Sequence, residues 1–458
     1  MFPRVLHGSV LLIVATLVGA TPASTTETAP EIAGLIERYA EEYLPRGEIL
    51  VGLDVNGESR WYSSGDLRPD SRFEIGSVTK TLTGMLLASE IASGRVTART
   101  TVDQLWPSGP RAAERGIPAV SGALADVTLE QLATHASGLP RLNLSPVRLL
   151  HTVVRQDDPY AGLSAADVFR DAASASLGES GTFQYSNVGY ALLGALLVED
   201  PFLSACYPEA YLDAVHTHVM APLELPRVSG SSAAGALPTA YTVNGRRADP
   251  WTFEGYFAAG GVIAPAADVL RYARMVHDLP LELATAIEPQ AAAGDDRSVG
   301  YGWLLEEIAS GETLIWHNGG TGGFRTFVAA VPERGVSVAV FGTSAVSVDA
   351  LGRAIVLGRD RAEAPETTTP LQWAIGGGLL LWLGWFVVSR LVRTQPTDLL
   401  TVTQGVVEAL FVTSVWARSA PPPLYVPGLE LLLVAAAIAV SGLQATRTVR
   451  AGESARFA

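Results

Sequence analysis

The chain has 458 residues and a formal net charge of -14 at pH 7. This length accommodates one α/β enzyme domain of about 300 residues together with an appendage. The arginines are scattered along an acidic chain, which argues against a nucleic-acid partner because phosphate binding needs basic patches. The single cysteine, Cys206, excludes an intrachain disulfide and a cysteine-rich metal site.

The amino terminus has the pattern of a secretory signal. Arg4 precedes an apolar run at 8–19, and small residues follow at Ala20 and Ala23. Residues 1–23 are therefore expected to be a signal peptide, and the domain that follows is expected to be exported. If the signal stays uncleaved, it becomes an additional anchor.

The first predicted elements belong to a domain at 31–348. Residues 32–44 have the amphipathic pattern of a helix, and residues 49–55 and 60–63 read as two strands joined across an Asn-Gly turn. A further helix is expected to open at Ser77 and to run to about Ser93, where Gly94 ends it.

Lys80 is the only lysine, and arginine supplies the other basic side chains. Arginine stays charged in proteins, whereas a partly buried lysine can be tuned toward neutrality and act as a base. Ser77 lies one turn earlier on the same helix face, at a helix start that offers backbone donors to an oxyanion. A serine at this spacing can also arise by chance.

Two further groups of residues follow along the chain. Tyr185 and Asn187 precede an apolar helix at 191–198 and can put a phenol and a carboxamide into one cleft, although a tyrosine at such a place is commonly a packing residue. His216 and His218 lie two residues apart in what reads as a helix, so they face different sides and do not suggest a metal site.

A glycine-rich segment lies between a strand at 313–316 and a strand pair at 326–331 and 336–341. It contains His317, Gly319 and Gly320. Glycines let a substrate backbone approach the strand edge, and the Gly320 N–H could complete an oxyanion hole with that of Ser77. The alternative is a glycine-rich hairpin with a surface histidine.

The ordered set Ser77/Lys80, Tyr185/Asn187 and His317/Gly319 resembles the SxxK, YxN and HxG motifs of the serine β-lactamase and penicillin-binding-protein superfamily, most closely its class C-like branch. The resemblance extends to residues 134–140, 259–262 and 331–336. It implies an α/β fold in which an antiparallel sheet is flanked by helices and joined to a helical subdomain.

The resemblance also implies roles for single residues. Ser77 becomes the nucleophile of an acyl-enzyme, Lys80 and Tyr185 share proton transfer, and which of the two is the base stays open. Asn187 would hold the acyl-side amide, and the N–H groups of Ser77 and Gly320 would hold the oxyanion. No metal or other cofactor is implied.

His317 stands where the family's lactamases carry lysine. A largely neutral imidazole puts carboxylate recognition and β-lactamase activity in doubt. Arg325 could supply the missing charge, but an outward surface arginine is the favoured expectation.

The carboxyl-terminal part predicts a membrane anchor. A Pro/Thr/Glu-rich linker at 362–370 leads into the region 371–443, which holds three apolar segments, at 371–388, 399–416 and 424–443. Each segment is long enough to span a bilayer as a helix, and Glu408 lies within the second. Arginines lie mainly between the first two segments and in the tail 444–458, so the positive-inside rule places the large domain outside the cell membrane.

This architecture resembles the membrane-bound prodrug-activating D-amino peptidases of nonribosomal peptide pathways. It predicts a membrane-anchored serine peptidase or amidase whose substrate is a peptide or small molecule containing a D-amino acid. A carboxylesterase, a D-Ala-D-Ala carboxypeptidase and a β-lactamase on the same fold remain alternatives, as does a non-catalytic sensor of a cell-wall ligand. The oligomeric state stays open.

Overall fold

The computed structural model describes residues 29–143, 158–198, 207–230, 236–294 and 296–365. The expected signal peptide, the three apolar segments, Cys206 and Glu408 lie outside these residues. Among the described residues, no helix has the length and apolar character needed to cross a membrane.

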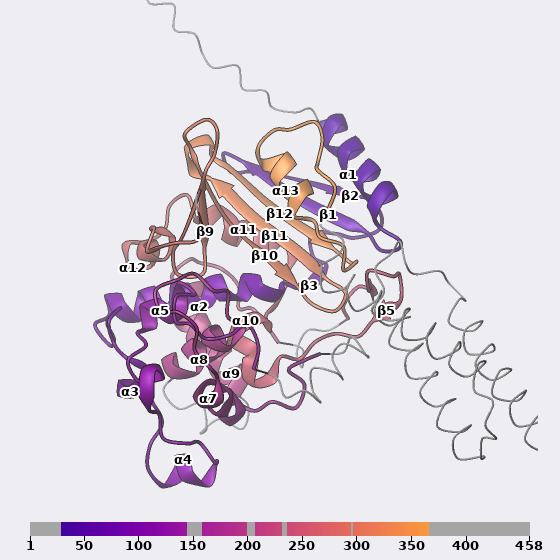
Figure 1. The fold of residues 1–458 in the computed structure, drawn as a ribbon. Coiled ribbons are helices and arrows are strands. Elements are labelled where there is room, and N and C mark those ends of the chain that lie inside the picture. The colour runs from indigo at the N-terminus through magenta and orange to yellow at the C-terminus, as the bar shows by residue number, and fades with distance from the viewer. Residues whose placement is uncertain (1–28, 144–157, 199–206, 231–235, 295, 366–458) are drawn as a thin grey trace, which may run out of the picture.

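An eight-stranded sheet forms the centre of the fold, in the order β2-β1-β12-β11-β10-β9-β8-β7, with every neighbouring pair antiparallel (Figure 1). Its strands are β1 (Ile49–Val55), β2 (Glu58–Ser63), β7 (Ala291–Ala292), β8 (Arg297–Val299), β9 (Leu304–Glu307), β10 (Thr313–Gly320), β11 (Arg325–Val331) and β12 (Val336–Gly342). Since β1 pairs with β12, the two ends of the domain meet inside the sheet.

The sheet buries both faces, because its strands alternate between two apolar clusters. In β1, Leu50 belongs to one cluster, whereas Ile49 and Val51 belong to the other. Helices α1 (Ala29–Tyr43) and α13 (Asp349–Val356) cover the second face, and α11 (Ala266–Met275) packs on the first (Figure 1).

A helical part continues the first cluster below the sheet (Figure 1). Its helices are α2 (Thr79–Ala92), α3 (Val102–Leu105), α4 (Pro110–Glu114), α5 (Leu129–Ala133), α7 (Ala165–Ser174), α8 (Asn187–Leu197), α9 (Tyr207–Val215), α10 (Phe257–Gly260) and α12 (Leu281–Ala284). Every residue of α8 is buried, as its apolar composition predicts. The α/β architecture with an antiparallel sheet and a helical part is thereby confirmed.

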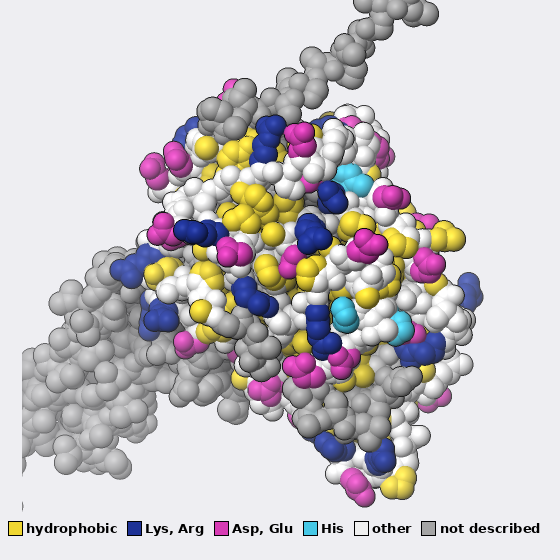
Figure 2. Space-filling model, turned by 180° about the vertical axis from the view of Figure 1, so that it is seen from behind, with side chains coloured by type: hydrophobic (Ala, Val, Ile, Leu, Met, Phe, Trp, Pro, Cys, Tyr) yellow, Lys and Arg dark blue, Asp and Glu magenta, His cyan; other side chains and the backbone are white. Residues whose placement is uncertain are grey.

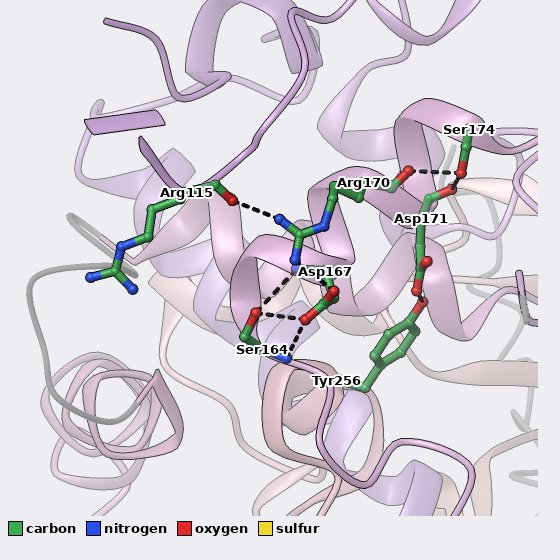
Figure 3. Close-up of polar contacts among 7 residues, drawn as sticks. All are labelled: Arg115, Ser164, Asp167, Arg170, Asp171, Ser174 and Tyr256. Atoms are coloured by element: carbon green, nitrogen blue, oxygen red, sulfur yellow. Dashed lines mark hydrogen bonds and ion pairs between the residues drawn. The ribbon is translucent and has the colours of Figure 1, made fainter. Parts of the chain in front are cut away.

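Polar contacts on α7 tie the helical part together (Figure 3). Ser164 caps the helix, with its side chain and that of Asp167 bonded reciprocally to backbone N–H groups. Tyr256 donates a hydrogen bond of 2.6 Å to Asp171. Burial and this carboxylate raise the pKa of Tyr256, so the phenol remains the donor.

Two short sheets join the main sheet to the helical part. The first pairs β3 (Arg72–Glu74) with β6 (Ile263–Pro265), and the second pairs β4 (Ala240–Tyr241) with β5 (Arg247–Ala248). Since β3 leads directly into the first residues of the motif around Ser77, its pairing fixes where that motif begins.

The expected boundaries near the amino terminus are close to those observed. The first strand has the predicted bounds, but its partner begins at Glu58 rather than at residue 60. Asp54 explains the difference, because its carboxylate accepts hydrogen bonds from the Gly57 N–H and the Ser59 hydroxyl and so fixes the tight turn. Gly94, with φ +76°, follows α2 as predicted.

Charged side chains of both signs are interspersed with apolar ones on the face shown in Figure 2. Several charged side chains of the described residues form ion pairs, such as Arg334–Glu312 and Arg353–Glu306. On that face, basic side chains form no continuous stripe.

Candidate active site

Ser77 lies at the junction between the sheet and the helical part. It belongs to a short 3₁₀ turn, η1 (Gly76–Val78), and α2 begins only at Thr79, so the predicted helix start at Ser77 is two residues too early. Both neighbours of Ser77 are buried, whereas Ser77 itself is partly exposed. Its side chain lines a cleft of about 760 Å³ between the two parts of the fold.

Lys80 is completely buried beside this serine. Its Nζ lies 3.1 Å from Ser77 Oγ and donates a hydrogen bond of 2.6 Å to the Ala259 carbonyl. Burial, helped by the charge of Arg141, lowers the pKa of the amine well below its usual value. A lowered pKa favours the neutral amine, whose lone pair can accept the serine proton at this distance.

Tyr185 lies two residues before α8, and its ring centroid is 4.9 Å from Lys80 Nζ. Burial raises the pKa of Tyr185 to about 12, while a hydrogen bond with Ser77 and the charge of Arg141 oppose the rise. The phenol therefore keeps its proton at neutral pH. The structure brings the phenol, the amine and the serine hydroxyl together, as the sequence predicts.

Asn187 is the first residue of α8 and is only 8% exposed. Its Nδ2 donates a hydrogen bond of 2.7 Å to the Tyr160 hydroxyl, and its backbone N–H donates to the Arg141 carbonyl. Its Oδ1 is buried and has no hydrogen-bond partner among the described residues. A buried acceptor without a partner is costly, so this oxygen is suited to a ligand N–H group.

The glycine-rich segment is part of a strand. We expected the strand to end at residue 316, but β10 continues to Gly320 and pairs there with Arg325. A Cβ at Gly319 would lie 1.9 Å from the Ile75 carbonyl oxygen, and one at Gly76 would lie 2.5 Å from the Gly320 nitrogen. The two glycines therefore let the backbones of β10 and η1 touch, so that Gly320 lies beside the turn that carries Ser77.

His317 is buried, so the alternative of a surface histidine is wrong. Its Nδ1 lies 2.6 Å from the Asn318 carbonyl oxygen. Burial and the neighbouring Lys80 lower the pKa of His317 to about 3, although the bond to Asn318 opposes this. The imidazole is neutral at pH 7 and supplies no cation to the cleft.

Arg325 does not point outward, contrary to the favoured expectation. It is half-buried at the start of β11, lines the cleft, and donates through Nη1 to the carbonyls of Thr321 and Phe324. Burial lowers its pKa to about 10, which leaves the guanidinium charged at neutral pH.

The residues that line the cleft but were not marked in the sequence include Arg141, Tyr160, Trp251 and Phe253. Arg141 follows the segment 134–140, which carries the family resemblance, and its guanidinium lies 5.2 Å from the Tyr185 ring centroid. No sequence pattern marks the aromatic residues, which meet only in the fold.

Glu74 is hydrogen-bonded to two residues that line the cleft. It is buried, and it accepts hydrogen bonds from the Trp251 N–H at 2.5 Å and the Thr321 hydroxyl at 2.6 Å. Burial raises the pKa of Glu74 to about 7, although both hydrogen bonds lower it. Its protonation therefore changes near neutral pH.

Other features of the described residues lie away from this cleft. An open groove of about 1350 Å³ runs along β7, β8 and β9 and contains none of the predicted site residues. His216 and His218 lie in a π-helical turn, His216–Met220. The part of the chain that the structure describes contains no group of three His, Cys, Asp or Glu side chains able to hold a metal.

Curated relatives cover most of the chain. The D-alanyl-D-alanine-carboxypeptidase/endopeptidase AmpH of Escherichia coli (strain K12) is 25% identical over 74% of this chain and 90% of its own length. Penicillin-binding protein 4 of Amycolatopsis lactamdurans is 25% identical over 67% of this chain and 83% of its own length.

Solved structures share the fold. A D-stereospecific amidohydrolase from Streptomyces sp. aligns with a TM-score of 0.57 at 19% identity, over 69% of this chain and 95% of that one. A class C beta lactamase from Rhodobacter sphaeroides aligns with a TM-score of 0.55 at 20% identity, over 69% of this chain and 94% of that one.

The family model named Beta-lactamase matches residues 37–360, which include the whole cleft motif from Ser77 to Gly320. This match covers more than half of the chain. The protein therefore belongs to the beta-lactamase family and is a serine hydrolase of that family.

Proposed function

We propose that this protein is a peptidase or amidase that acts on peptides containing D-amino acids through an acyl-enzyme on Ser77. The observation that carries the proposal is the buried Lys80 amine, whose pKa is lowered by burial and whose Nζ lies 3.1 Å from Ser77 Oγ. Among the described residues it forms no ion pair, and its position beside the Ser77 hydroxyl suits it to activate that nucleophile.

Acylation begins with proton transfer from Ser77 Oγ to Lys80 Nζ. The serine oxygen attacks the amide carbonyl, and the N–H groups of Ser77 and Gly320 hold the oxyanion that forms. Lys80 is the better proton acceptor of the two candidates, because Tyr185 still holds its own proton at neutral pH. Tyr185 then gives its proton to the leaving nitrogen as the C–N bond breaks, and takes one from the Lys80 ammonium.

Deacylation repeats these steps with water. Lys80 takes a proton from the water molecule, the hydroxide adds to the ester carbonyl, and the same two N–H groups hold the second oxyanion. Collapse of this intermediate breaks the bond to Ser77 Oγ, which takes the proton from the Lys80 ammonium and so restores the neutral amine. The products are a carboxylic acid and the free enzyme.

Two observations support an amide that contains a D-residue as the substrate. An amine can leave only when it is protonated, and the arrangement of Lys80 and Tyr185 supplies that proton. Relatives named D-alanyl-D-alanine-carboxypeptidase/endopeptidase and D-stereospecific amidohydrolase favour the D-configuration next to the bond that is cleaved. The free Asn187 Oδ1 would accept the N–H of an N-acyl group on that residue.

The alternatives use the same residues and differ in substrate. A carboxylesterase would not need a proton for its leaving group. A D-Ala-D-Ala carboxypeptidase or a β-lactamase must recognise a substrate carboxylate. The neutral His317 gives no charge for it, so the carboxylate would have to pair with an arginine that lines the cleft, such as Arg325. A non-catalytic sensor would not need a buried lysine with a lowered pKa beside Ser77.

The location of the enzyme is part of the proposal. Residues 1–23 would export the domain, and the segments within 371–443 would hold it at the outer face of the cell membrane. Protease added to intact spheroplasts should then remove the catalytic domain. Full protection of the domain would contradict this location.

The test of the substrate class uses the full-length protein in detergent with paired N-acetyl-D-alanine and N-acetyl-L-alanine p-nitroanilides. We expect hydrolysis of the D-amide, a much slower reaction with the L-amide, and no reaction of Ser77→Ala with either. Rapid cleavage of simple p-nitrophenyl esters with no cleavage of either amide would replace the peptidase by the carboxylesterase.

A further inference from the structure

A second buried histidine packs against Tyr185 and takes no part in the acyl-transfer steps. His135 follows α5, is 2% exposed, and has a left-handed backbone with φ +59°. Among non-glycine residues, histidine, asparagine and aspartate tolerate this conformation best. A buried and strained polar residue needs an explanation beyond packing.

The backbone on both sides of Tyr185 is bonded to His135. The Gln184 N–H donates to the His135 carbonyl at 2.7 Å, and the Ser186 N–H donates to His135 Nδ1 at 3.0 Å. One residue thus holds the positions immediately before and after the tyrosine.

The imidazole also packs against the phenol itself. The ring centroids of His135 and Tyr185 lie 4.4 Å apart with an interplanar angle of 33°. Tyr190 and Phe183 pack on the same imidazole, with centroids at 4.8 Å and 5.5 Å. The imidazole is therefore fixed on several sides and in turn limits how the Tyr185 ring can rotate.

The imidazole must be neutral to act in this way, because Nδ1 accepts a hydrogen bond only when it carries a lone pair. Burial lowers the pKa of His135 well below its usual value, and the positive charge of Arg141 lowers it further. The neutral ring carries its proton on Nε2 and leaves Nδ1 to accept the Ser186 N–H.

We propose that His135 is a positioning residue that holds the Tyr185 hydroxyl in line for proton transfer to the leaving group, through its two backbone contacts and its ring contact. This inference rests on the proposed role of Tyr185 as the proton donor. This role for His135 also explains how the segment 134–140, which contains none of the proposed catalytic residues, contributes to the reaction.

The test compares amide and ester substrates with the same acyl group. A p-nitrophenolate leaves without a proton, whereas an amine needs one, so a displaced phenol slows the amide much more than the ester. His135→Asn keeps an acceptor near the Nδ1 position and tolerates the left-handed backbone, but it lacks the ring. We expect kcat/KM for N-acetyl-D-alanine p-nitroanilide to fall by about 10- to 100-fold and that for the p-nitrophenyl ester by less than about threefold.

A double-mutant cycle tests whether the effect passes through the phenol. In the Tyr185→Phe background, which has no hydroxyl to position, His135→Asn should change the amide rate by less than about twofold. Full additivity of the two losses would overturn the inference. His135→Phe, which keeps a ring and removes the acceptor, gives an independent second variant if His135→Asn does not accumulate as folded protein.

Ser137→Ala is the matched control. Ser137 lies in the same segment, is 1% exposed, and accepts the Leu139 N–H through Oγ, but it bonds neither neighbour of Tyr185. All rates are divided by the concentration of active sites, which is titrated with a fluorophosphonate probe. We expect this control to lower stability and to leave the amide-to-ester ratio unchanged.

The outcomes separate the two proposals. If Tyr185→Phe leaves the amide-to-ester ratio unchanged, the proposed role of the tyrosine fails. If Tyr185→Phe lowers the ratio but both His135 variants leave it unchanged, only the positioning role of His135 fails.

Discussion

Replacing Gly319 by alanine tests whether the approach of β10 to η1 builds the site. The added Cβ would lie 1.9 Å from the Ile75 carbonyl oxygen, about 1.5 Å short of the 3.4 Å at which ordinary contact begins. The opposing atom is backbone, so no side-chain rotation relieves the contact. The strand and the turn that carries Ser77 must move apart.

The size of the effect follows from this displacement. A shift of about 1 Å in a reacting group can cost about 100-fold in rate, and an overpacked contact typically costs about 1–3 kcal/mol of stability. We expect Gly319→Ala to lower kcat/KM by about 100-fold or more, through kcat, and to lower the melting temperature. The two N–H groups would no longer converge on one oxyanion.

The assay is steady-state hydrolysis of the D-amide, with thermal unfolding of the same samples. Gly34→Ala is the control, because that glycine lies in α1 and its added Cβ would meet only the flexible end of Arg38. The control should keep full activity and gain up to about 1 kcal/mol of stability. Wild-type kcat in Gly319→Ala would refute the argument that this contact forms the oxyanion site.

Three other changes test the remaining groups. Lys80→Met keeps the length of the side chain but removes the base, so acylation should fall by about 100- to 10,000-fold in stopped-flow traces while the melting temperature stays the same or rises. Glu74→Gln tests the raised pKa of Glu74, which is about 7 in the folded protein against an ordinary value of 4.5 in the unfolded chain. The free energy of unfolding of the wild type, relative to that of the variant, should therefore fall as pH rises from 4.5 to about 7. Equal pH dependence of the two proteins in denaturant titrations would contradict the burial argument. Tyr160→Phe removes the acceptor for Asn187 Nδ2, and we expect a severalfold higher KM for N-acyl substrates with a smaller change in kcat; an unchanged KM would show that this bond does not orient the amide.

The fold was predictable where local patterns matched the final environment. The first strand and its turn agreed with the sequence because Asp54 and an Asn-Gly pair specify that hairpin without help from distant residues. The apolar helix α8 was predicted because it is buried on all sides, but it begins at Asn187, four residues before the predicted start at 191, and so includes the asparagine expected to precede it. The end of β10 was missed because glycines usually end strands, whereas here they allow contact with η1.

The proximity of Ser77, Lys80 and Tyr185 was predictable because the proposed chemistry restricts residue type and spacing. Lys80 and Ser77 share one helical turn, so their contact follows from local geometry alone. Arg325 was misjudged, since a first residue of a strand gives no sign that it will face a cleft. The aromatic residues Tyr160 and Trp251 come from segments about 90 residues apart in the chain, and only tertiary packing brings their rings to 6.1 Å.

The measurement that tests the central claim most directly is the intact mass of the full-length protein after brief exposure to an N-acyl-D-alanine p-nitrophenyl ester. The account predicts one added acyl group on the wild type, none on Ser77→Ala, and slow or no formation on Lys80→Met. An adduct that persists in folded Ser77→Ala, or a folded wild type that hydrolyses the D-amide without any adduct in rapid-quench samples, would contradict an acyl-enzyme on Ser77.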